Sequence, residues 1–112
     1  MIGDEAMLVG SEPQPVVLAM EEICRFAEHD PVLPAARGAV GHGTAYARAG
    51  DYFGALVNLV ARAVKVAGPG GIVVTAETAL LLHGDRFELR PIGAHDLRGI
   101  GAPVELVAVS VA

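Results

Sequence analysis

The sequence predicts an α+β fold, in which helices cover a largely antiparallel sheet. Residues 15–27 and 53–67 carry apolar side chains at helical spacing. Short apolar runs, bounded by Gly and Pro, occur at residues 72–75, 87–91 and 103–111. Because helical and strand-like segments are mixed along the chain without an internal repeat, a layered arrangement of both is favoured.

Length and composition exclude several classes of protein. A chain of 112 residues forms one domain, residues 1–112, with a modest core. The net charge of −5 gives no reason to expect nucleic-acid binding, which shows a basic patch. No apolar run reaches the roughly 20 residues of a membrane helix, and the start of the chain does not resemble a signal peptide. The single cysteine, Cys24, excludes an internal disulfide. We expect a cytoplasmic protein.

The N-terminal half is expected to contain a hairpin, a helix and a strand. Residues 1–9 alternate loosely and place Asp4 at the turn of the hairpin. The helix over residues 15–27 is expected to end before Pro31. Residues 36–47 are rich in Gly and small apolar residues and predict one strand, whose glycines indicate close approach of another backbone or a ligand.

The stretch from Gly50 to Arg62 organises the remainder. It predicts a tight turn carrying Asp51, followed at once by a helix over residues 53–67 that the Gly-Pro-Gly-Gly run after it ends. Asn58 and Arg62 are four residues apart and are expected to share one face of that helix.

Two further expectations concern packing and capping. The apolar stripe of the central helix is expected to consist of Val57, Val60, Ala61 and Val64. Thr75 is expected to cap a short helix over residues 76–82 that follows the buried strand 72–75.

Four motifs occur in the order that one known family uses. They are D-Y-F-G-x-x-V-N-x-x-A-R at residues 51–62 and the segments at residues 2–7, 69–74 and 97–104. The chain resembles the C-terminal portion of the class III adenylate/guanylate cyclase catalytic domain over nearly its whole length. The resemblance implies a ferredoxin-like cyclase core, truncated at its N-terminus.

The resemblance also implies roles for single residues. Asp51 would accept a hydrogen bond from the adenine amino group, which points to ATP instead of GTP. Asn58 would orient the ribose, and Arg62 would stabilise negative charge on the phosphate in the transition state. Asp4 matches the second of two carboxylates that hold Mg²⁺ or Mn²⁺. Taken singly, these residues also fit a turn, a helix cap or a solvated surface. Lys65, one turn beyond Arg62, is expected to be solvated, the alternative being a phosphate contact.

Parts of the family pattern have no counterpart here. The first metal Asp, in a motif like F-x-D-I-x-G-F, is not found, and the Lys that reads adenine would fall immediately before Met1. The resemblance therefore implies an adenylate cyclase fragment, inactive alone, that binds ATP and pairs as a homodimer or with an intact cyclase. Whether the chain is itself an enzyme (a phosphorus-oxygen lyase in cAMP signalling) stays open. The alternatives are a non-catalytic dimerisation or regulatory remnant and an accidental match by an unrelated ferredoxin-like domain.

Overall fold

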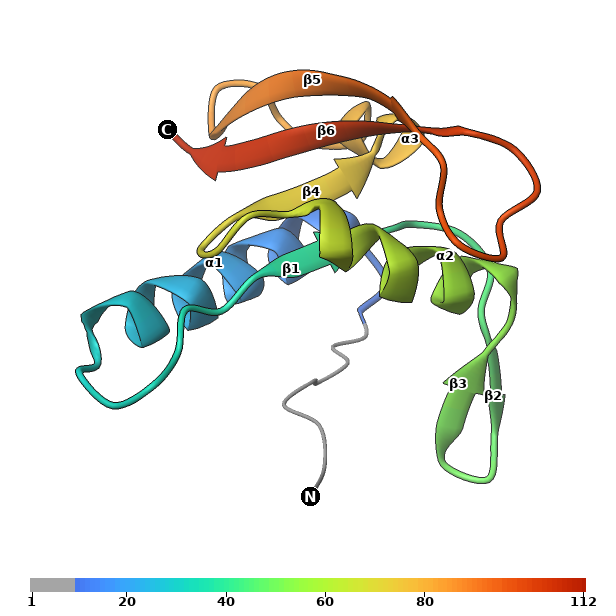
Figure 1. The fold of residues 1–112 in the computed structure, drawn as a ribbon, viewed down its shortest axis with the longest axis horizontal. Helices are drawn as coiled ribbons and strands as arrows, with labels where there is room; N and C mark the ends of the chain where they lie inside the picture. The colour runs from blue at the N-terminus through green and yellow to red at the C-terminus, as the bar shows by residue number, and fades with distance from the viewer. Residues whose placement is uncertain (1–9) are drawn as a thin grey trace.

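The computed structural model describes residues 10–112 (Figure 1). The predicted hairpin at residues 1–9, with Asp4 at its turn, lies outside the described residues. The elements are α1 (Pro13–His29), β1 (Gly38–Val40), β2 (Tyr46–Arg48), β3 (Asp51–Phe53), α2 (Ala55–Ala63), the 3₁₀ helix η1 (Val64–Val66), β4 (Ile72–Thr75), α3 (Ala76–Ala79), β5 (Phe87–His95) and β6 (Val104–Val111).

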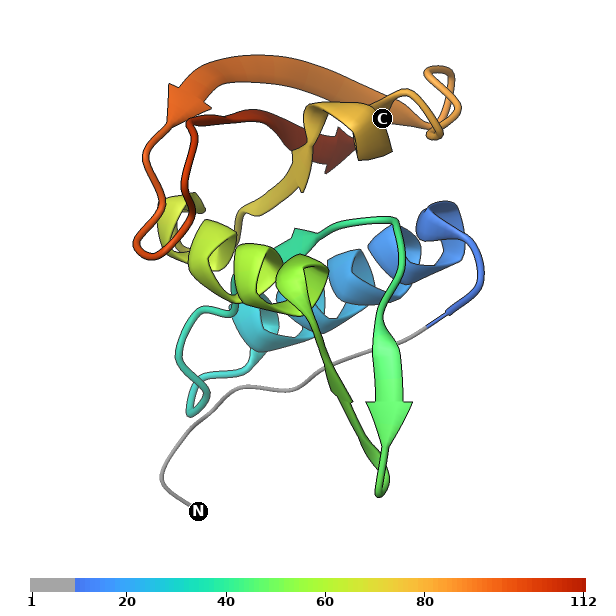
Figure 2. The same cartoon turned by 90° about the vertical axis from the view of Figure 1, so that its right-hand side faces the viewer.

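Four strands form the main sheet, in the order β1-β4-β6-β5. β1 is parallel to β4, whereas β4 and β5 both pair with β6 in antiparallel register. β2 and β3 form a separate antiparallel hairpin, which projects from the body of the domain in both views (Figures 1 and 2). Helices packed on a mixed sheet confirm the predicted α+β class.

Strand β4 is buried on both faces of the sheet, since all four of its residues are buried. Val74 faces a cluster that contains Val17 of α1. Its neighbour Val73 faces the opposite cluster, which contains Ala63 of α2. Alternate strand residues point to opposite faces, so α1 and α2 cover different sides of the sheet. Burying each such valine contributes about 1.5–3 kcal/mol.

Two glycines, Gly38 in β1 and Gly41 directly after it, let α1 and α2 pack closely on this segment. β1 lies between the two helices in Figure 1. A Cβ atom on Gly38 would collide with Met20 of α1. One on Gly41 would lie 2.7 Å from Cγ2 of Val60 and 3.0 Å from Cδ1 of Leu56, both on α2. The glycines of this segment do mark close approach, but the approaching groups are helix side chains and not the backbone or ligand that the sequence led us to expect.

Helix α1 is longer than the predicted 15–27 at both ends. Pro13 occupies its first turn, where a missing N–H costs no hydrogen bond. Asp30 ends it, and its Oδ1 accepts hydrogen bonds from the backbone N–H groups of Val32 at 2.8 Å and Leu33 at 3.1 Å. Such an Asx turn directs the chain away from the helix axis.

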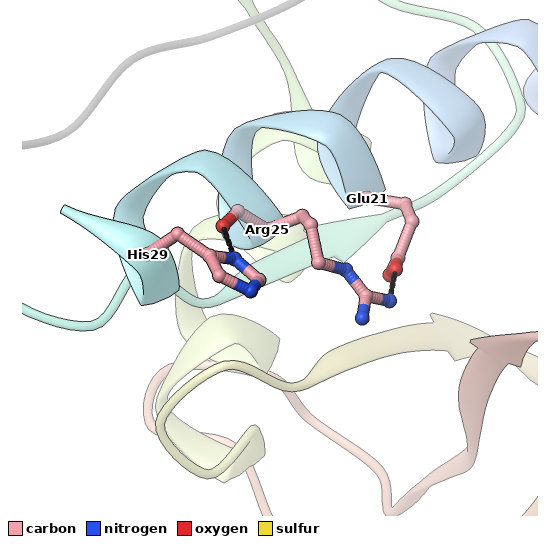
Figure 3. A network of polar contacts seen from close by, with 3 residues as sticks. All are labelled: Glu21, Arg25 and His29. Atoms are coloured by element: carbon pink, nitrogen blue, oxygen red, sulfur yellow. Dashed lines mark hydrogen bonds and ion pairs between the residues drawn. The ribbon is translucent and has the colours of Figure 1, made fainter.

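The outer face of α1 carries a polar network (Figure 3). Arg25 forms an ion pair with Glu21, and this hydrogen bond raises the pKa of Arg25. Nδ1 of His29 donates to the backbone carbonyl of Arg25 at 2.9 Å, since a carbonyl oxygen can only accept. The network is exposed to solvent, so it adds little stability.

The prediction of one strand over residues 36–47 is wrong. β1 ends at Val40, and β2 belongs to the separate hairpin. The central helix starts at Ala55, not at residue 53, because the preceding residues form β3. The turn between β2 and β3 is made by Ala49 and Gly50, whose φ angles of 53° and 80° suit a two-residue hairpin turn.

The expected apolar stripe on α2 is partly wrong. Ala61 is exposed, whereas Ala63 lies in the core at 2% exposure. Val60 and Val64 do pack against the core, together with Leu59.

The prediction for the segment that follows is largely confirmed. The strand 72–75 is found with the predicted bounds, and Oγ1 of Thr75 caps α3 by accepting from the backbone N–H of Thr78 at 3.2 Å. Helix α3 ends at Ala79, short of the predicted residue 82. β5 continues past Pro91 to His95 over a bulge, and its place at the edge of the sheet tolerates a proline. Across residues 10–112, the helices are too short or too polar to cross a membrane.

Candidate functional site

Helix α2 positions two of the predicted site residues. Gly54 precedes it with a φ of 128°, and its carbonyl accepts the first helical hydrogen bond, from the backbone N–H of Asn58, at 3.1 Å. Asn58 is exposed, and Arg62, one turn later, is half-buried. Because residues four apart lie on one helix face, the structure places these two side chains on the same side of α2, as predicted.

The side chain of Arg62 lines a small cavity of about 210 Å³, which we call the cationic cavity. It lies between the end of α2, η1 and the link from β5 to β6. Its lining residues are Arg62, Lys65, Val66, Asp96, Leu97 and Arg98. Three cations and one carboxylate line it, so its charge favours an anion.

Asp51 lies apart from this cavity. It is the first residue of β3, next to the turn of the hairpin, and it pairs in register with Arg48. The carboxylate is exposed, and its Oδ1 accepts from the backbone N–H of Tyr52 at 2.8 Å. The hairpin precedes the start of α2, whereas Arg62 is in the last turn of that helix. A helix of nine residues is roughly 13 Å long, so the structure does not bring Asp51 and Arg62 together.

Sequence reasoning does not place two of the three cations, Lys65 and Arg98, at the cationic cavity. It marks Arg98 only as part of a motif, and it predicts a solvated Lys65. Lys65 is indeed exposed, but it lines the cavity beside Arg62. Arg98 reaches the cavity from a distant part of the chain, and local periodicity contains no signal for such a contact.

The described residues do not form a metal site by themselves. Nowhere in residues 10–112 do three or more His, Cys, Asp or Glu side chains come together to hold a metal ion. Asp4, the expected ligand of Mg²⁺ or Mn²⁺, lies outside the described residues, so its role stays a prediction.

A larger, open hollow of about 530 Å³ lies along the outer face of α1. Its lining residues are Glu21, Glu22, Arg25, Phe26, His29, Asp30 and Pro31. It contains none of the predicted site residues, so the cationic cavity is the better candidate.

The fold is that of nucleotide cyclase catalytic domains. The crystal structure of an adenylate/guanylate cyclase/hydrolase from Silicibacter pomeroyi matches 85% of this chain and 59% of that chain with a TM-score of 0.66. At 23% sequence identity, this likeness concerns the fold alone. No family model matches the sequence.

Two relatives of known family identify the family of this chain. The chain is 35% identical over 112 residues to the pH-sensitive adenylate cyclase MT1302 of Mycobacterium tuberculosis (strain CDC 1551 / Oshkosh), covering 96% of this chain and 28% of that protein. It is 37% identical over 110 residues to an adenylate cyclase of Glutamicibacter nicotianae, covering 96% of this chain and 27% of the relative. The chain thus spans only 28% and 27% of the length of these two relatives. It belongs to the class III adenylate/guanylate cyclase catalytic domain family, and the hypothesis of an accidental match is wrong.

Proposed function

We propose that this chain supplies the nucleotide-recognition side of an adenylate cyclase site, in which ATP becomes cyclic AMP and pyrophosphate. The proposal rests on one observation: Asn58 and Arg62 share a face of α2, and Arg62 lines the cationic cavity. An amide beside a guanidinium, with more positive charge behind it, suits a ribose followed by phosphates.

Arg62 has the catalytic role in this proposal. In the proposed reaction, the ribose 3′-hydroxyl attacks the α-phosphorus and the pyrophosphate leaves, so negative charge builds up on the phosphate oxygens. A guanidinium keeps its charge and can donate to two oxygens at once, and a half-buried one is worth more to the transition state than a fully solvated one. Asn58 orients the ribose, since its amide can both donate and accept.

Asp51 reads the base. Its exposed carboxylate accepts hydrogen bonds, which suits the amino group of adenine and not the carbonyl that guanine has at that position. Because Asp51 and Arg62 lie at opposite ends of α2, the ligand must be elongated, with its base near the hairpin and its phosphates near the cationic cavity. ATP has this shape.

Metal binding is assigned to Asp4, which we keep as the proposed ligand of Mg²⁺ or Mn²⁺. A carboxylate supplies the oxygen donors that either ion prefers. The steps above are confined to side chains of residues 10–112, which form no metal site by themselves.

The proposed partner is a second cyclase domain, either another copy of this chain or an intact cyclase. Support comes from the β2–β3 hairpin, on which Tyr46 and Phe53 are 60% and 49% exposed. Apolar rings on a projecting hairpin suit burial against another domain. We propose that the chain is inactive alone and acts in the cytoplasm, where Cys24 stays reduced.

The test is complementation. The 112-residue chain is mixed with a cyclase that keeps its metal carboxylates but lacks its transition-state Arg, and cyclic AMP formed from Mn²⁺-ATP is measured. We expect the wild-type chain and an Arg90→Ala control to restore cyclic AMP, and Arg62→Ala to restore none. If the wild-type chain associates with the partner by sedimentation but produces no cyclic AMP, the proposal is wrong.

A similar mixture tests the second candidate function, a non-catalytic dimerisation or regulatory remnant, which the exposed hairpin also supports. Here the partner is an intact, unmutated cyclase. A remnant would change the activity of that cyclase to the same extent whether or not it carries the Arg62→Ala substitution. If the change in cyclase activity depends on Arg62, this second candidate function is excluded.

A further inference from the structure

The proposed function uses one cation of the cationic cavity and leaves Lys65 without a role. We propose that Lys65 is a polyphosphate-binding residue, which holds the phosphates beyond the reacting one and hence the pyrophosphate product. This inference rests on the proposed function, because it extends the same site.

The geometry places Lys65 beside Arg62. It lies in η1, which continues directly from α2, three residues after Arg62. Residues three apart on a helix are surface neighbours, and both side chains line the cationic cavity. Arg98 lines it from the link between β5 and β6, so cations approach a bound group from two separate segments of the chain.

The charges of this cavity are not neutralised within the described part of the chain. The ion pair between Glu21 and Arg25 is the single salt bridge of residues 10–112, and it lies on α1. Asp96 is the one carboxylate that lines the cavity, and it is not within ion-pair distance of the cations. Since like charges repel, an anion that binds between the cations relieves an unfavourable interaction.

Size and charge together indicate the class of ligand. A volume of about 210 Å³ is several times the roughly 30 Å³ share of one water molecule, so phosphate-sized groups fit. Three cations spread along the lining match several linked phosphates better than one. Lys65 contributes a mobile point charge with three donors, whereas the two arginines contribute planar forks.

The experiment titrates the 112-residue chain with pyrophosphate and, separately, with orthophosphate by calorimetry, without added metal. We expect pyrophosphate to bind more tightly than orthophosphate. Lys65→Gln should weaken pyrophosphate binding about two- to fivefold, the size expected for one exposed charge. Lys65→Arg should retain most of the affinity, and Arg90→Gln, which removes a cation from β5 outside the cavity, should leave it unchanged. Thermal unfolding of each variant verifies that the fold is intact.

Three results would overturn the inference. These are equal affinity for the two anions, an equal loss in Lys65→Gln and Arg90→Gln, or no loss in Lys65→Gln. Because pyrophosphate binding is measured without catalysis, its result is independent of complementation. Lys65-dependent binding without restored cyclic AMP would support this inference and contradict the proposed function, and restored cyclic AMP without Lys65-dependent binding would do the reverse.

Discussion

The rings of Tyr46 and Phe53 face each other across the β2–β3 hairpin, with centroids 5.9 Å apart and planes inclined by 32°. The two residues are register partners on neighbouring strands, and such an aromatic pair contributes about 0.5–1.5 kcal/mol beyond its buried area. This contact between the rings stiffens the hairpin. Because both rings remain about half-exposed, the pair also offers apolar surface to another domain.

Phe53→Ala is therefore expected to weaken association with a second cyclase domain about tenfold, in line with the loss of one aromatic anchor. Sedimentation velocity over a concentration series measures it. Phe26→Ala is the matched control, since Phe26 is 66% exposed on α1, away from the hairpin. Equal weakening by both changes would contradict a role for the hairpin.

Gly41→Ala is expected to destabilise the domain by about 1–3 kcal/mol, because the added methyl group would press on Val60 and Leu56 of α2. Urea unfolding followed by circular dichroism measures the free energy of unfolding. Gly68→Ala serves as the control, since nothing lies within 4 Å of a Cβ atom at Gly68. A Gly41→Ala variant as stable as Gly68→Ala would show that α2 packs on β1 more loosely than these distances indicate.

Thr78→Val is expected to cost about 0.5–1.5 kcal/mol, the net contribution of a typical intramolecular hydrogen bond. Oγ1 of Thr78 accepts from the backbone N–H of His42 at 3.0 Å and lies 2.6 Å from Oγ1 of Thr75. Hydrogen exchange at the amide of His42 should accelerate in the same variant. The exposed Thr44 provides the control, Thr44→Val, which should change neither quantity.

Burial, and then the charge of nearby Glu21, raises the pKa of the Cys24 thiol. Iodoacetamide at a pH of about 8 should therefore alkylate the folded chain roughly tenfold or more slowly than the chain in urea, because the thiolate is the nucleophile. Since the folded state holds the thiol proton more tightly than the unfolded state, this group stabilises the fold below the unfolded pKa of about 8.5. That contribution is lost as the pH rises through the higher folded pKa.

As the pH rises above the unfolded pKa of about 8.5, the unfolding free energy should accordingly fall more steeply in the wild type than in Cys24→Ala. Identical slopes in the two proteins would mean that the thiol is not perturbed.

Local signals explain which elements could be predicted from the sequence. α1 has an apolar face and prolines at both ends, and β4 is a short β-branched run between a Gly-rich turn and the capping Thr75. The β2–β3 hairpin escapes prediction because Ala49, an uncommon residue at positive φ, occupies its turn. No Asn-Gly or Asp-Gly pair marks that turn.

The candidate site likewise has features that could be predicted from the sequence and features that could not. Asn58 and Arg62 could be placed on one face because helical spacing alone relates them. The cationic cavity could not be predicted, since it depends on how the link after β5 returns to η1, and tertiary packing decides that contact. The separation of Asp51 from Arg62 likewise follows from the unpredicted hairpin.

The strand order also constrains how the domain is made. β6 lies between β4 and β5, so neither of those strands has its antiparallel neighbour until residues 104–111 have been synthesised. During translation, β4 and β5 therefore wait with open edges, which are prone to pair with other chains. These edges close only when β6 emerges, which pairs with β5 as the next strand of the chain and with β4 across the residues between them.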